Sequence, residues 1–479
     1  MPSSLDVAAL LPFLLLVLGA LLLMLSEVFL KSQGRGYQSG LAIAFGLAAA
    51  LAAPFSPERA IFGGQAISDG FSGFVAVVVC AGLVLSVLLG RGWLEQRNIE
   101  RGEYYALVLF ALAGMMLMAV AADLLIIFLA LEVFSLALYV LTGLRRKVFA
   151  STEGAFKYFV LGGFSSAFFL YGIAFTYGLV GSTHLDRVTA AIQAQSLTGN
   201  PLLLVAMGLL LVGFAFKVAA VPFHMWTPDA YEGAPTIVTG FMSTAVKAAA
   251  FAAFARVFLS ALEPLRGEWA PVLWVLAVCT MILGAVVGVA QTNLKRMLAY
   301  SSIAHGGYLL VALVSGSDVG KASILFYLVV YAVTNLGAFA IIALLSTRET
   351  PMEHLDDYKG LWFSSPVMAG VLTVFLLSLG GFPPTAGFVA KWYVFSAAVR
   401  AGQYSLAIVG VLTSVVSVFF YLRIVVMMYM SDRAEGAAPP QPSRTALAAL
   451  AVSVAILLYL GVLPTRLLDL AARSVALVF

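Results

Sequence analysis

Long, continuous apolar runs separated by short polar segments dominate the sequence, and they limit the possible folds more than any other feature. A helix crosses a bilayer with about 20 apolar residues, whereas a transmembrane strand needs about 10 residues of alternating polarity. The runs here are too long and too evenly apolar for strands. The chain is 62% hydrophobic and 10% charged, far from the composition of soluble domains. We therefore predict an all-α, polytopic protein embedded in a lipid bilayer.

The apolar runs predict about fourteen spans. They are 7–30, 37–54, 71–90, 104–121, 123–143, 154–180, 200–221, 236–260, 270–292, 297–315, 320–346, 366–392, 405–430 and 445–463. The first run is too long for the apolar core of a signal peptide, so we expect it to remain as a helix. The twelfth run is interrupted, and 386–400 is either its second half or a loop.

Basic residues in the connecting segments predict the orientation, because Lys and Arg are concentrated in cytoplasmic loops. Fourteen follow odd-numbered spans: Lys31, Arg35, Arg91, Arg97, Arg101, Arg145, Arg146, Lys147, Lys295, Arg296, Arg348, Lys359, Arg433 and Arg444. Seven follow even-numbered spans or lie in the tails: Arg59, Arg187, Arg266, Lys321, Arg400, Arg466 and Arg473. This asymmetry predicts that both termini lie on the periplasmic side.

Six basic residues remain, and all of them lie inside predicted spans: Lys157, Arg256, Arg423, Lys217, Lys247 and Lys391. The first three are near span ends, where their side chains are expected to reach the membrane surface. The other three are deeper, where a charge usually faces a protein interior or a water-filled cavity. We therefore treat these three lysines as candidate functional residues.

Lys247 is the strongest of the three candidates. It lies about 16 Å or more from either end of its span at 1.5 Å of rise per residue, too far for its side chain to reach bulk water. Burial disfavours the charged ammonium form, and a lysine that can be neutral or charged can carry a proton, unlike an arginine. Glu132, about 13 Å into its span, is the candidate acidic partner, and we expect it to pair with Lys217. A helix–helix hydrogen bond is the alternative role for Glu132.

Two predicted spans are interrupted by proline close to a buried lysine. Pro222 follows Lys217 by five residues, and Pro383 and Pro384 precede Lys391 by about seven. Non-helical backbone at membrane depth persists only where it is buried in protein or lines a wet cavity. The two breaks fall in spans seven and twelve, so spans 4–8 and 9–13 are predicted to form inverted five-helix repeats, an architecture of secondary transporters.

His305 lies midway along the tenth span and occupies the place that Glu132 has in the first repeat. A neutral histidine bonded to a hydroxyl is one interpretation. The other is a proton relay between Lys247 and Lys391, which suits the near-neutral pKa that histidine ordinarily has.

Several functions are not supported by the sequence. The net charge of +4 is spread over the whole chain, which argues against nucleic-acid binding, and two isolated cysteines provide neither a zinc site nor a disulfide framework. No Walker loop and no dinucleotide, haem or flavin signature is found. We expect this chain to bind no cofactor and to perform no redox chemistry of its own.

Five segments carry a resemblance to a known family. They are DLLIIFLALEVFSLALYVLTG, EGAFKYFVLGGFSSAFFLYGIAFTYG, FKVAAVPFHMWTPDAYEGAPTIVTGFMSTAVKAAAFA, LKRMLAYSSIAHGGYLL and GFPPTAGFVAKWYVF. Together they resemble the antiporter-like subunits of respiratory complex I, the bacterial NADH:quinone oxidoreductase, and within that family the subunit N group. The likeness covers residues 100–430.

The resemblance implies proton translocation coupled to quinone reduction elsewhere in a complex of the bacterial inner membrane. It implies proton transfer by Glu132, Lys217, Lys247, His305 and Lys391. NADH, FMN, Fe–S clusters and quinone would be bound by partner subunits, and sister antiporter-like subunits would be among the neighbours. The alternatives are a subunit of a multi-subunit Na⁺/H⁺ (Mrp-type) antiporter and a membrane scaffold without transport.

The chain is accordingly divided into four segments. We expect an N-terminal three-helix segment at 1–100, the first antiporter-like repeat at 101–262, the inverted repeat at 263–430 and a C-terminal helix at 431–479.

Overall fold

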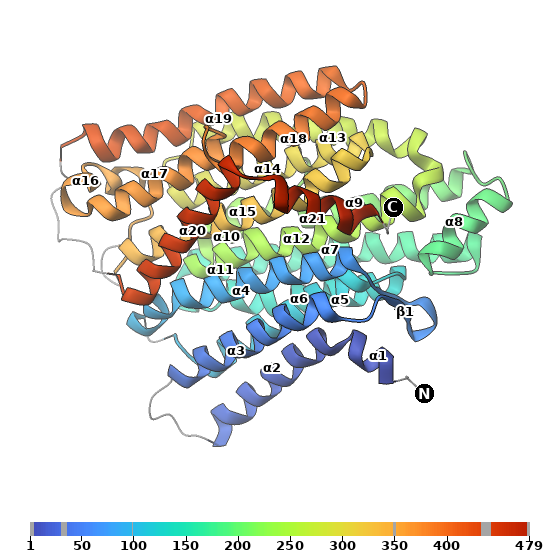
Figure 1. Ribbon diagram of the computed structural model, residues 1–479, viewed down its shortest axis with the longest axis horizontal. Coiled ribbons are helices and arrows are strands. Elements are labelled where there is room, and N and C mark those ends of the chain that lie inside the picture. Colours follow the sequence, from blue (N-terminus) through green and yellow to red (C-terminus); the bar gives the residue numbers. More distant parts are fainter. Residues whose placement is uncertain (1–3, 30–35, 98, 348–350, 433–441, 477–479) are drawn as a thin grey trace.

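The computed structural model describes residues 4–29, 36–97, 99–347, 351–432 and 442–476. Within these ranges, thirteen helices are long and apolar enough to cross a membrane. They lie side by side, with α2 (Leu11–Phe29) at one edge and α19 (Tyr404–Met430) at the opposite edge (Figure 1). The predicted all-α, polytopic membrane fold is confirmed. Four basic residues of the orientation count lie outside the described residues: Lys31, Arg35, Arg348 and Arg433.

The N-terminal part contains helices and one small β-hairpin, and the apolar pattern did not indicate the hairpin. Its helices are α1 (Ser4–Ala9), α2, α3 (Gly36–Ala52) and α4 (Gly70–Gln96). Strands β1 (Arg59–Ile61) and β2 (Ala66–Ser68) pair antiparallel just before α4. Asp69 and Ser72 form a capping box, so α4 begins directly after the hairpin.

The following helices include the first interruption. They are α5 (Gly102–Val120), α6 (Leu124–Thr142), α7 (Phe149–Val180), α8 (Leu185–Ala194), α9 (Pro201–Val218) and α10 (Trp226–Gly233). The Asn200 side chain caps the start of α9, and Pro201 occupies its first turn, where a missing N–H costs nothing. Ala219 ends α9 in the left-handed conformation, and a turn containing Pro222 leads into α10.

The eighth predicted span is buried except at Ser260, which is half-buried. It contains α11 (Thr236–Phe241), a π-helical segment at Met242–Val246, α12 (Lys247–Arg256) and a second π-helical segment at Val257–Ala261. Because nearly all of its side chains are buried, it forms the centre of the molecule.

The second half contains the other interruption. Its helices are α13 (Arg266–Val289), α14 (Leu294–Ser315), α15 (Asp318–Leu345), α16 (Leu361–Ser364), α17 (Pro366–Gly380), α18 (Ala386–Arg400) and α19. Residues 386–400 are therefore helical, as the second half of the interrupted run. The chain continues with α20 (Arg444–Val462) and the amphipathic helix α21 (Thr465–Ala476), which packs against α15 and α4.

Burial divides the helices into central and outer ones. The most apolar windows of α14 and α15 are 94% and 89% buried, whereas those of α13 and α19 are 39% buried and carry many exposed aliphatic side chains. This pattern is typical of a membrane protein whose central helices carry the polar side chains and whose outer helices face lipid.

Candidate functional site

Lys217 is buried in the last turn of α9, beside the first interruption. Its Nζ donates a hydrogen bond of 2.7 Å to Ser135 Oγ on α6. Four aromatic rings surround the ammonium group, with centroids 5.5–5.7 Å from Nζ: Phe134, Tyr139, Tyr158 and Phe216. Ring faces attract a cation, so this cage favours a charged lysine that burial alone would disfavour.

Glu132 lies on α6, three residues before Ser135, and is partly buried. One of its carboxylate oxygens accepts a hydrogen bond from Ser166 Oγ on α7. Although both residues are described, Glu132 and Lys217 form no ion pair within 4 Å. The expected direct pairing is therefore absent, because packing turns Lys217 towards Ser135 and Glu132 towards Ser166.

Lys247 is the first residue of α12, directly after the first π-helical segment. Its Nζ donates to the carbonyl oxygen of Ser302 on α14 and lies 5.5 Å from the ring centroid of Tyr331 on α15. At Gly306 a Cβ would lie 3.5 Å from Lys247 Nζ and 3.0 Å from the carbonyl oxygen of Val218. The small residue thus leaves room for the lysine next to the end of α9.

His305 lies on α14 and is held by two tyrosine hydroxyls. Its Nδ1 is 2.6 Å from the hydroxyl of Tyr327, and its Nε2 is 3.3 Å from that of Tyr421. The Tyr421 hydroxyl in turn lies 2.5 Å from Ser301 Oγ. Both ring nitrogens therefore have partners that can donate or accept a proton.

Lys391 lies on α18, beside the second interruption. Its Nζ donates to the carbonyl oxygen of Gly380 at 3.0 Å and to Ser414 Oγ at 2.8 Å. Gly381 has a φ of +84°, and a Cβ there would lie 2.9 Å from Lys391 Cδ. Glycine is required here both by the left-handed backbone and by the lysine side chain.

Aromatic rings connect three of these residues. Tyr331 is adjacent to Lys247, at 5.5 Å, and to His305, at 5.2 Å between ring centroids. Tyr308 is adjacent to His305, at 5.5 Å, and to Lys391, at 5.1 Å. The hydroxyls of both tyrosines are buried. Lys247, His305 and Lys391 thus form one continuous buried series, and Glu132 and Lys217 form a neighbouring cluster.

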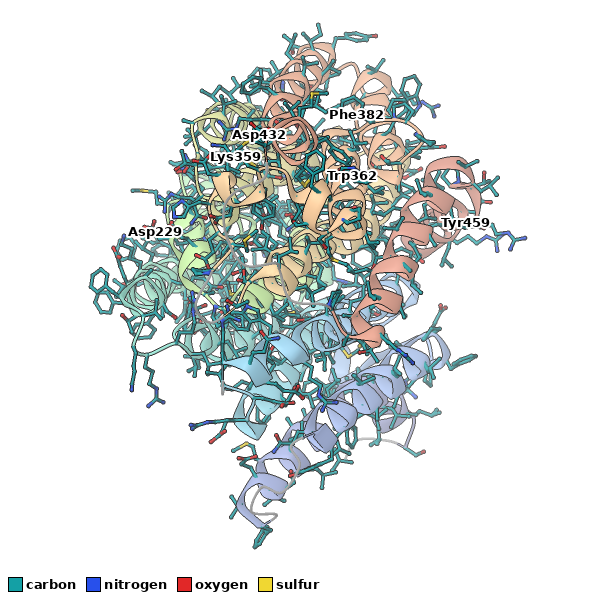
Figure 2. The ribbon with its side chains drawn as sticks, turned by 90° about the vertical axis from the view of Figure 1, so that its left-hand side faces the viewer. Asp229, Lys359, Trp362, Phe382, Asp432 and Tyr459 are labelled. Atoms are coloured by element: carbon teal, nitrogen blue, oxygen red, sulfur yellow. The ribbon has the colours of Figure 1, made fainter. Side chains whose placement is uncertain are left out.

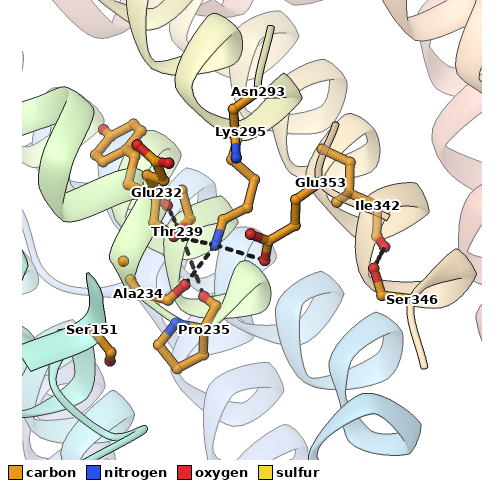
Figure 3. A network of polar contacts seen from close by, with 12 residues as sticks. Ser151, Glu232, Ala234, Pro235, Thr239, Asn293, Lys295, Ile342, Ser346 and Glu353 are labelled. Atoms are coloured by element: carbon orange, nitrogen blue, oxygen red, sulfur yellow. Dashed lines mark hydrogen bonds and ion pairs between the residues drawn. The ribbon is translucent and has the colours of Figure 1, made fainter. Parts of the chain in front are cut away.

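Lys295 is a buried lysine that the sequence analysis counted as a loop residue. Its Nζ donates to the carbonyl oxygens of Glu232 and Ala234, at 2.6 and 2.8 Å, and lies 3.5 Å from Glu353 Oε1 (Figure 3). It thereby caps the last carbonyls of α10. Its place two residues after Asn293, at a helix start in the sequence LKRM, gave no sign of this burial.

Charged side chains on α10 also connect both halves of the molecule. Asp229 accepts from Lys157 on α7 at 2.7 Å and from Arg296 on α14 at 2.6 Å, and Arg296 also reaches Glu232 at 2.8 Å. Asp229 is visible at the end of the molecule that faces the viewer in Figure 2. The short helix after the first interruption is thus held by ion pairs on both sides.

The three charges expected near span ends behave differently from one another. Lys157 remains 42% exposed, as expected for a side chain that reaches the surface. Arg423 donates to the carbonyl oxygens of Val289 and Gln291. Arg256 is buried and forms two contacts with the Asp69 carboxylate, at 2.9 and 3.1 Å. The expectation that Arg256 reaches the surface is wrong, because the cap of α4 provides a buried partner.

The described part of the chain contains no group of three or more His, Cys, Asp or Glu side chains that could hold a metal ion. What this site offers chemically is a set of ammonium, imidazole, hydroxyl and carboxylate groups. Such groups exchange protons.

A membrane-embedded helical bundle with two interrupted helices and buried lysines defines the class of antiporter-like membrane subunits. Residues 121–417 match the family described as "NADH:quinone oxidoreductase/Mrp antiporter, TM". The chain belongs to this family, as the sequence resemblance predicted.

Comparisons with individual proteins show which members of this family the chain is similar to. NADH-quinone oxidoreductase subunit N of Trichlorobacter lovleyi is 42% identical over 99% of this chain and 98% of its own length. The subunit N of Myxococcus xanthus is 44% identical over 96% of both chains. A chain of respiratory complex I from Thermus thermophilus with bound aureothin is 35% identical and superposes with a TM-score of 0.83 over 96% of this chain and 99% of its own. A chain of the Mrp complex from Dietzia shares the fold, with a TM-score of 0.86 over 99% of this chain and 98% of its own, at 21% identity.

Proposed function

We propose that this chain translocates protons as the subunit N of a bacterial NADH:quinone oxidoreductase. The relatives of this name match it over nearly their whole length at more than 40% identity. The Mrp-type antiporter is the weaker alternative, because the 21% identity to its subunit supports the shared fold alone. Partners would be the other membrane-arm subunits, including sister antiporter-like subunits, and those that bind NADH, FMN, Fe–S clusters and quinone.

The observation that carries the proposal is the continuous buried series of Lys247, His305 and Lys391. These three side chains are at most 6% exposed, and Tyr331 and Tyr308 lie between them. Buried ionisable residues in membrane spans typically mark proton or ion pathways. Protons would enter from the cytoplasm near Glu132 and Lys217, cross through Lys247 and His305, and leave at Lys391.

Coupling would be electrostatic. Lys217 is held by ring faces and one hydroxyl, with no carboxylate within 4 Å among the described residues, so its charge responds to changes nearby. Quinone reduction elsewhere in the complex would change the field at one end. Each lysine that gains or loses a proton would then alter the proton affinity of the next.

We also propose the inverted repeats, at 101–262 and 263–430, between the segments 1–100 and 431–479. Two β-bridges support them: Asp123 pairs with His184 before α6, and Asn293 pairs with His354 before α14. In both places the histidine is followed by Leu-Asp, and the bridged Asp or Asn caps the next helix.

The two interruptions support the same repeats. Ala219 and Gly381 both end a helix in the left-handed conformation, and a proline follows three residues later in each case. In this alignment Lys391 corresponds to Asp229. When residues are counted from the helix caps Asp123 and Asn293, Glu132 corresponds to Ser302 and His305 corresponds to Ser135. The sequence alone instead predicts that His305 occupies the position of Glu132.

For the location we propose the bacterial inner membrane, with both termini on the periplasmic side. The orientation is supported by the distribution of basic residues between the two sets of loops. The α8 segment lies at the right-hand end in Figure 1 and α16 at the left-hand end, which would be the periplasmic and cytoplasmic ends.

Lys247→Met tests the function directly. We expect the reconstituted complex to assemble but to lose most NADH-driven proton pumping, because methionine fills similar space without a proton site. Lys247→Arg should also be defective, since an arginine stays charged.

Lys359→Met is the matched control, because Lys359 is 45% exposed and, among the described residues, pairs only with Asp356, at 2.8 Å. It should pump normally. Full pumping by both Lys247 variants would overturn the assignment and would favour a scaffold without transport.

A further inference from the structure

A cavity of about 650 Å³ lies where the ends of α4 and α6 meet the start of α5. Five basic side chains line it: Arg97, Arg101, Arg145, Arg146 and Lys147. Glu103 is the only acidic residue in its described lining. Nothing in the proton-transfer site uses this cavity.

Two of these arginines are only partly satisfied by the protein. Arg97 stacks over Trp93 at 4.2 Å and donates to the Thr347 carbonyl oxygen, but its Nη1 is buried without a partner among the described residues. Arg145 donates to the Gly233 carbonyl oxygen at 3.0 Å, while its Nε has no partner in the same part of the chain. Buried guanidinium N–H groups normally have acceptors, so these two N–H groups are available to an acceptor bound in the cavity.

Glu353 offsets the charges of Arg97 and Arg145 only in part. Burial and then the nearby charge of Arg145 lower the pKa of Arg97 to about 10, and burial lowers the pKa of Arg145. A bound anion would reverse both effects. The concentration of basic residues in cytoplasmic loops explains why Arg146 and Lys147 are present, but it does not explain two half-buried arginines with unpaired N–H groups beside a cavity.

An apolar surface continues from the cavity along α6. Ile99, Tyr104, Leu107, Val140, Leu144 and Val148 complete the described lining. Val140 is 54% exposed, and it continues a line of exposed side chains on the same helix face: Leu125, Leu129, Val133 and Leu136. From residue 125 to 140 this line is about 22 Å long at 1.5 Å per residue, comparable to an extended acyl chain.

We propose that this cavity binds the phosphate headgroup of an anionic phospholipid, whose acyl chains lie along the exposed face of α6. Basic pockets between transmembrane helices on the cytoplasmic side are suited to such headgroups, and guanidinium groups bind phosphate oxygens in a bidentate manner. Because Arg145 also caps α10, the lipid would be connected through one side chain to the helix that carries Asp229.

The test uses the purified intact assembly that contains the full chain, depleted of lipid in detergent. Thermal unfolding is followed after addition of cardiolipin, phosphatidylglycerol, phosphatidylcholine or inorganic phosphate. The matched variants are Arg146→Gln/Lys147→Gln, at the exposed rim of the cavity, and Lys359→Gln/Arg444→Gln, two exposed charges elsewhere. The first pair should leave the fold intact, because both side chains are exposed.

We expect the two anionic lipids to raise the unfolding midpoint by several degrees in the wild type and in the control pair, and at least twofold less in Arg146→Gln/Lys147→Gln. Native mass spectrometry should show fewer retained anionic lipids in that variant alone. Equal retention by both variants would overturn the proposal. So would an equal effect of phosphatidylcholine, or a full effect of inorganic phosphate alone.

A photo-crosslinker in place of Val148, at the cavity edge, identifies the occupant in the intact assembly. Crosslinks to phospholipid support the proposal. Crosslinks exclusively to an acidic segment of a partner polypeptide would overturn it.

Discussion

At the scale of single residues, hydroxyl groups hold the buried charges in place. Ser135, Ser166 and Ser414 contact Lys217, Glu132 and Lys391 respectively, each across a helix–helix interface. A serine hydroxyl accepts from an ammonium and donates to a carboxylate, so it suits a group whose protonation changes. Direct ion pairs would instead fix both partners in their charged forms.

Ser135→Ala should lower proton pumping several-fold without preventing assembly. It removes the hydrogen bond that Lys217 donates, and hydrogen bonds to charged groups contribute about 1.5–3 kcal/mol. Initial rates of NADH-driven acidification, normalised to assembled complex, measure the effect.

Ser453→Ala is the matched control, because Ser453 is equally buried on α20 but, within the described part of the chain, donates only to the Ala449 carbonyl oxygen. It should pump at the wild-type rate. Equal rates for the two variants would show that the Lys217–Ser135 contact has no role in transfer.

The sequence located the buried lysines but could not predict their partners. Depth within an apolar run singled out Lys217, Lys247 and Lys391, because a charge there is costly. Which group each lysine contacts depends on helix packing and side-chain direction. The lengths and spacing of the apolar runs do not determine either of these. Lys295 was missed for the related reason that its burial is produced by α10 and Glu353, which are distant in sequence.

At the scale of helices, buried contacts at helix ends connect the parts of the bundle. Arg256 at the end of α12 binds Asp69 at the cap of α4, which joins the central helix to the N-terminal segment. Close approach of backbones has the same effect at the second interruption, where Gly387 on α18 packs against Ser378 on α17.

Removing one partner of the Arg256–Asp69 pair should be strongly destabilising. We expect Arg256→Met to cost about 3–5 kcal/mol, because the Asp69 carboxylate, which is only 12% exposed, would lose its counter-charge. The double variant Arg256→Met/Asp69→Asn should recover part of this loss. The unfolding midpoint of the purified assembly, compared across the single and double variants, provides the measurement.

The exposed Lys359–Asp356 pair serves as the reference. Asp356→Asn should cost less than about 1 kcal/mol, since surface ion pairs contribute little. If Arg256→Met were as mild as Asp356→Asn, the buried pair would not be a structural connection.

Gly387→Ala should reduce the amount of assembled protein severely. An added Cβ would lie 1.8 Å from the carbonyl oxygen of Ser378, which cannot move without unwinding the end of α17. Gly370→Ala on α17 is the control, because a Cβ there meets nothing within 4 Å. It should be neutral or stabilising by up to about 1 kcal/mol. Quantification of folded protein in membranes compares the two, and similar yields would contradict the packing at this interruption.

The sequence predicted the long helices well and the short ones poorly. Apolar length alone defined the membrane-crossing runs. Helices α8 and α21 and the hairpin of β1 and β2 escaped that criterion because they are short and mixed in polarity. The half-helix α10 was hidden because proline, glycine and charged residues in its sequence suggest a loop.

At the scale of the whole molecule, the proposed inverted repeats relate the two ends of the bundle. The bridge of Asp123 with His184 and that of Asn293 with His354 would lie on opposite sides of the membrane. A single architectural unit would then serve as the entry half and, inverted, as the exit half of one pathway.

Cysteine labelling tests the orientation that this arrangement requires. Gln195→Cys lies in the exposed turn after α8. It should react with a membrane-impermeant maleimide added to cells whose inner membrane is intact and whose periplasmic face is accessible to the reagent. Lys359→Cys should react only in inverted membrane vesicles. Both variants are made in a background in which Cys80 and Cys279 are replaced, and the reversed labelling pattern would contradict the proposed topology.

The near-complete burial of the eighth span has a consequence for biogenesis. Residues 236–261 are buried except at the half-buried Ser260, yet they carry Lys247 and Arg256, each of which costs about 2.5–3.5 kcal/mol when a helix is inserted alone. This segment gains its stability only from neighbours, including Asp69 on α4 and the later helices α14 and α15. We therefore expect its stable integration to be cooperative. The ribosome synthesises this segment before α14 and α15, so the segment becomes stable in the membrane only after these later helices have been inserted.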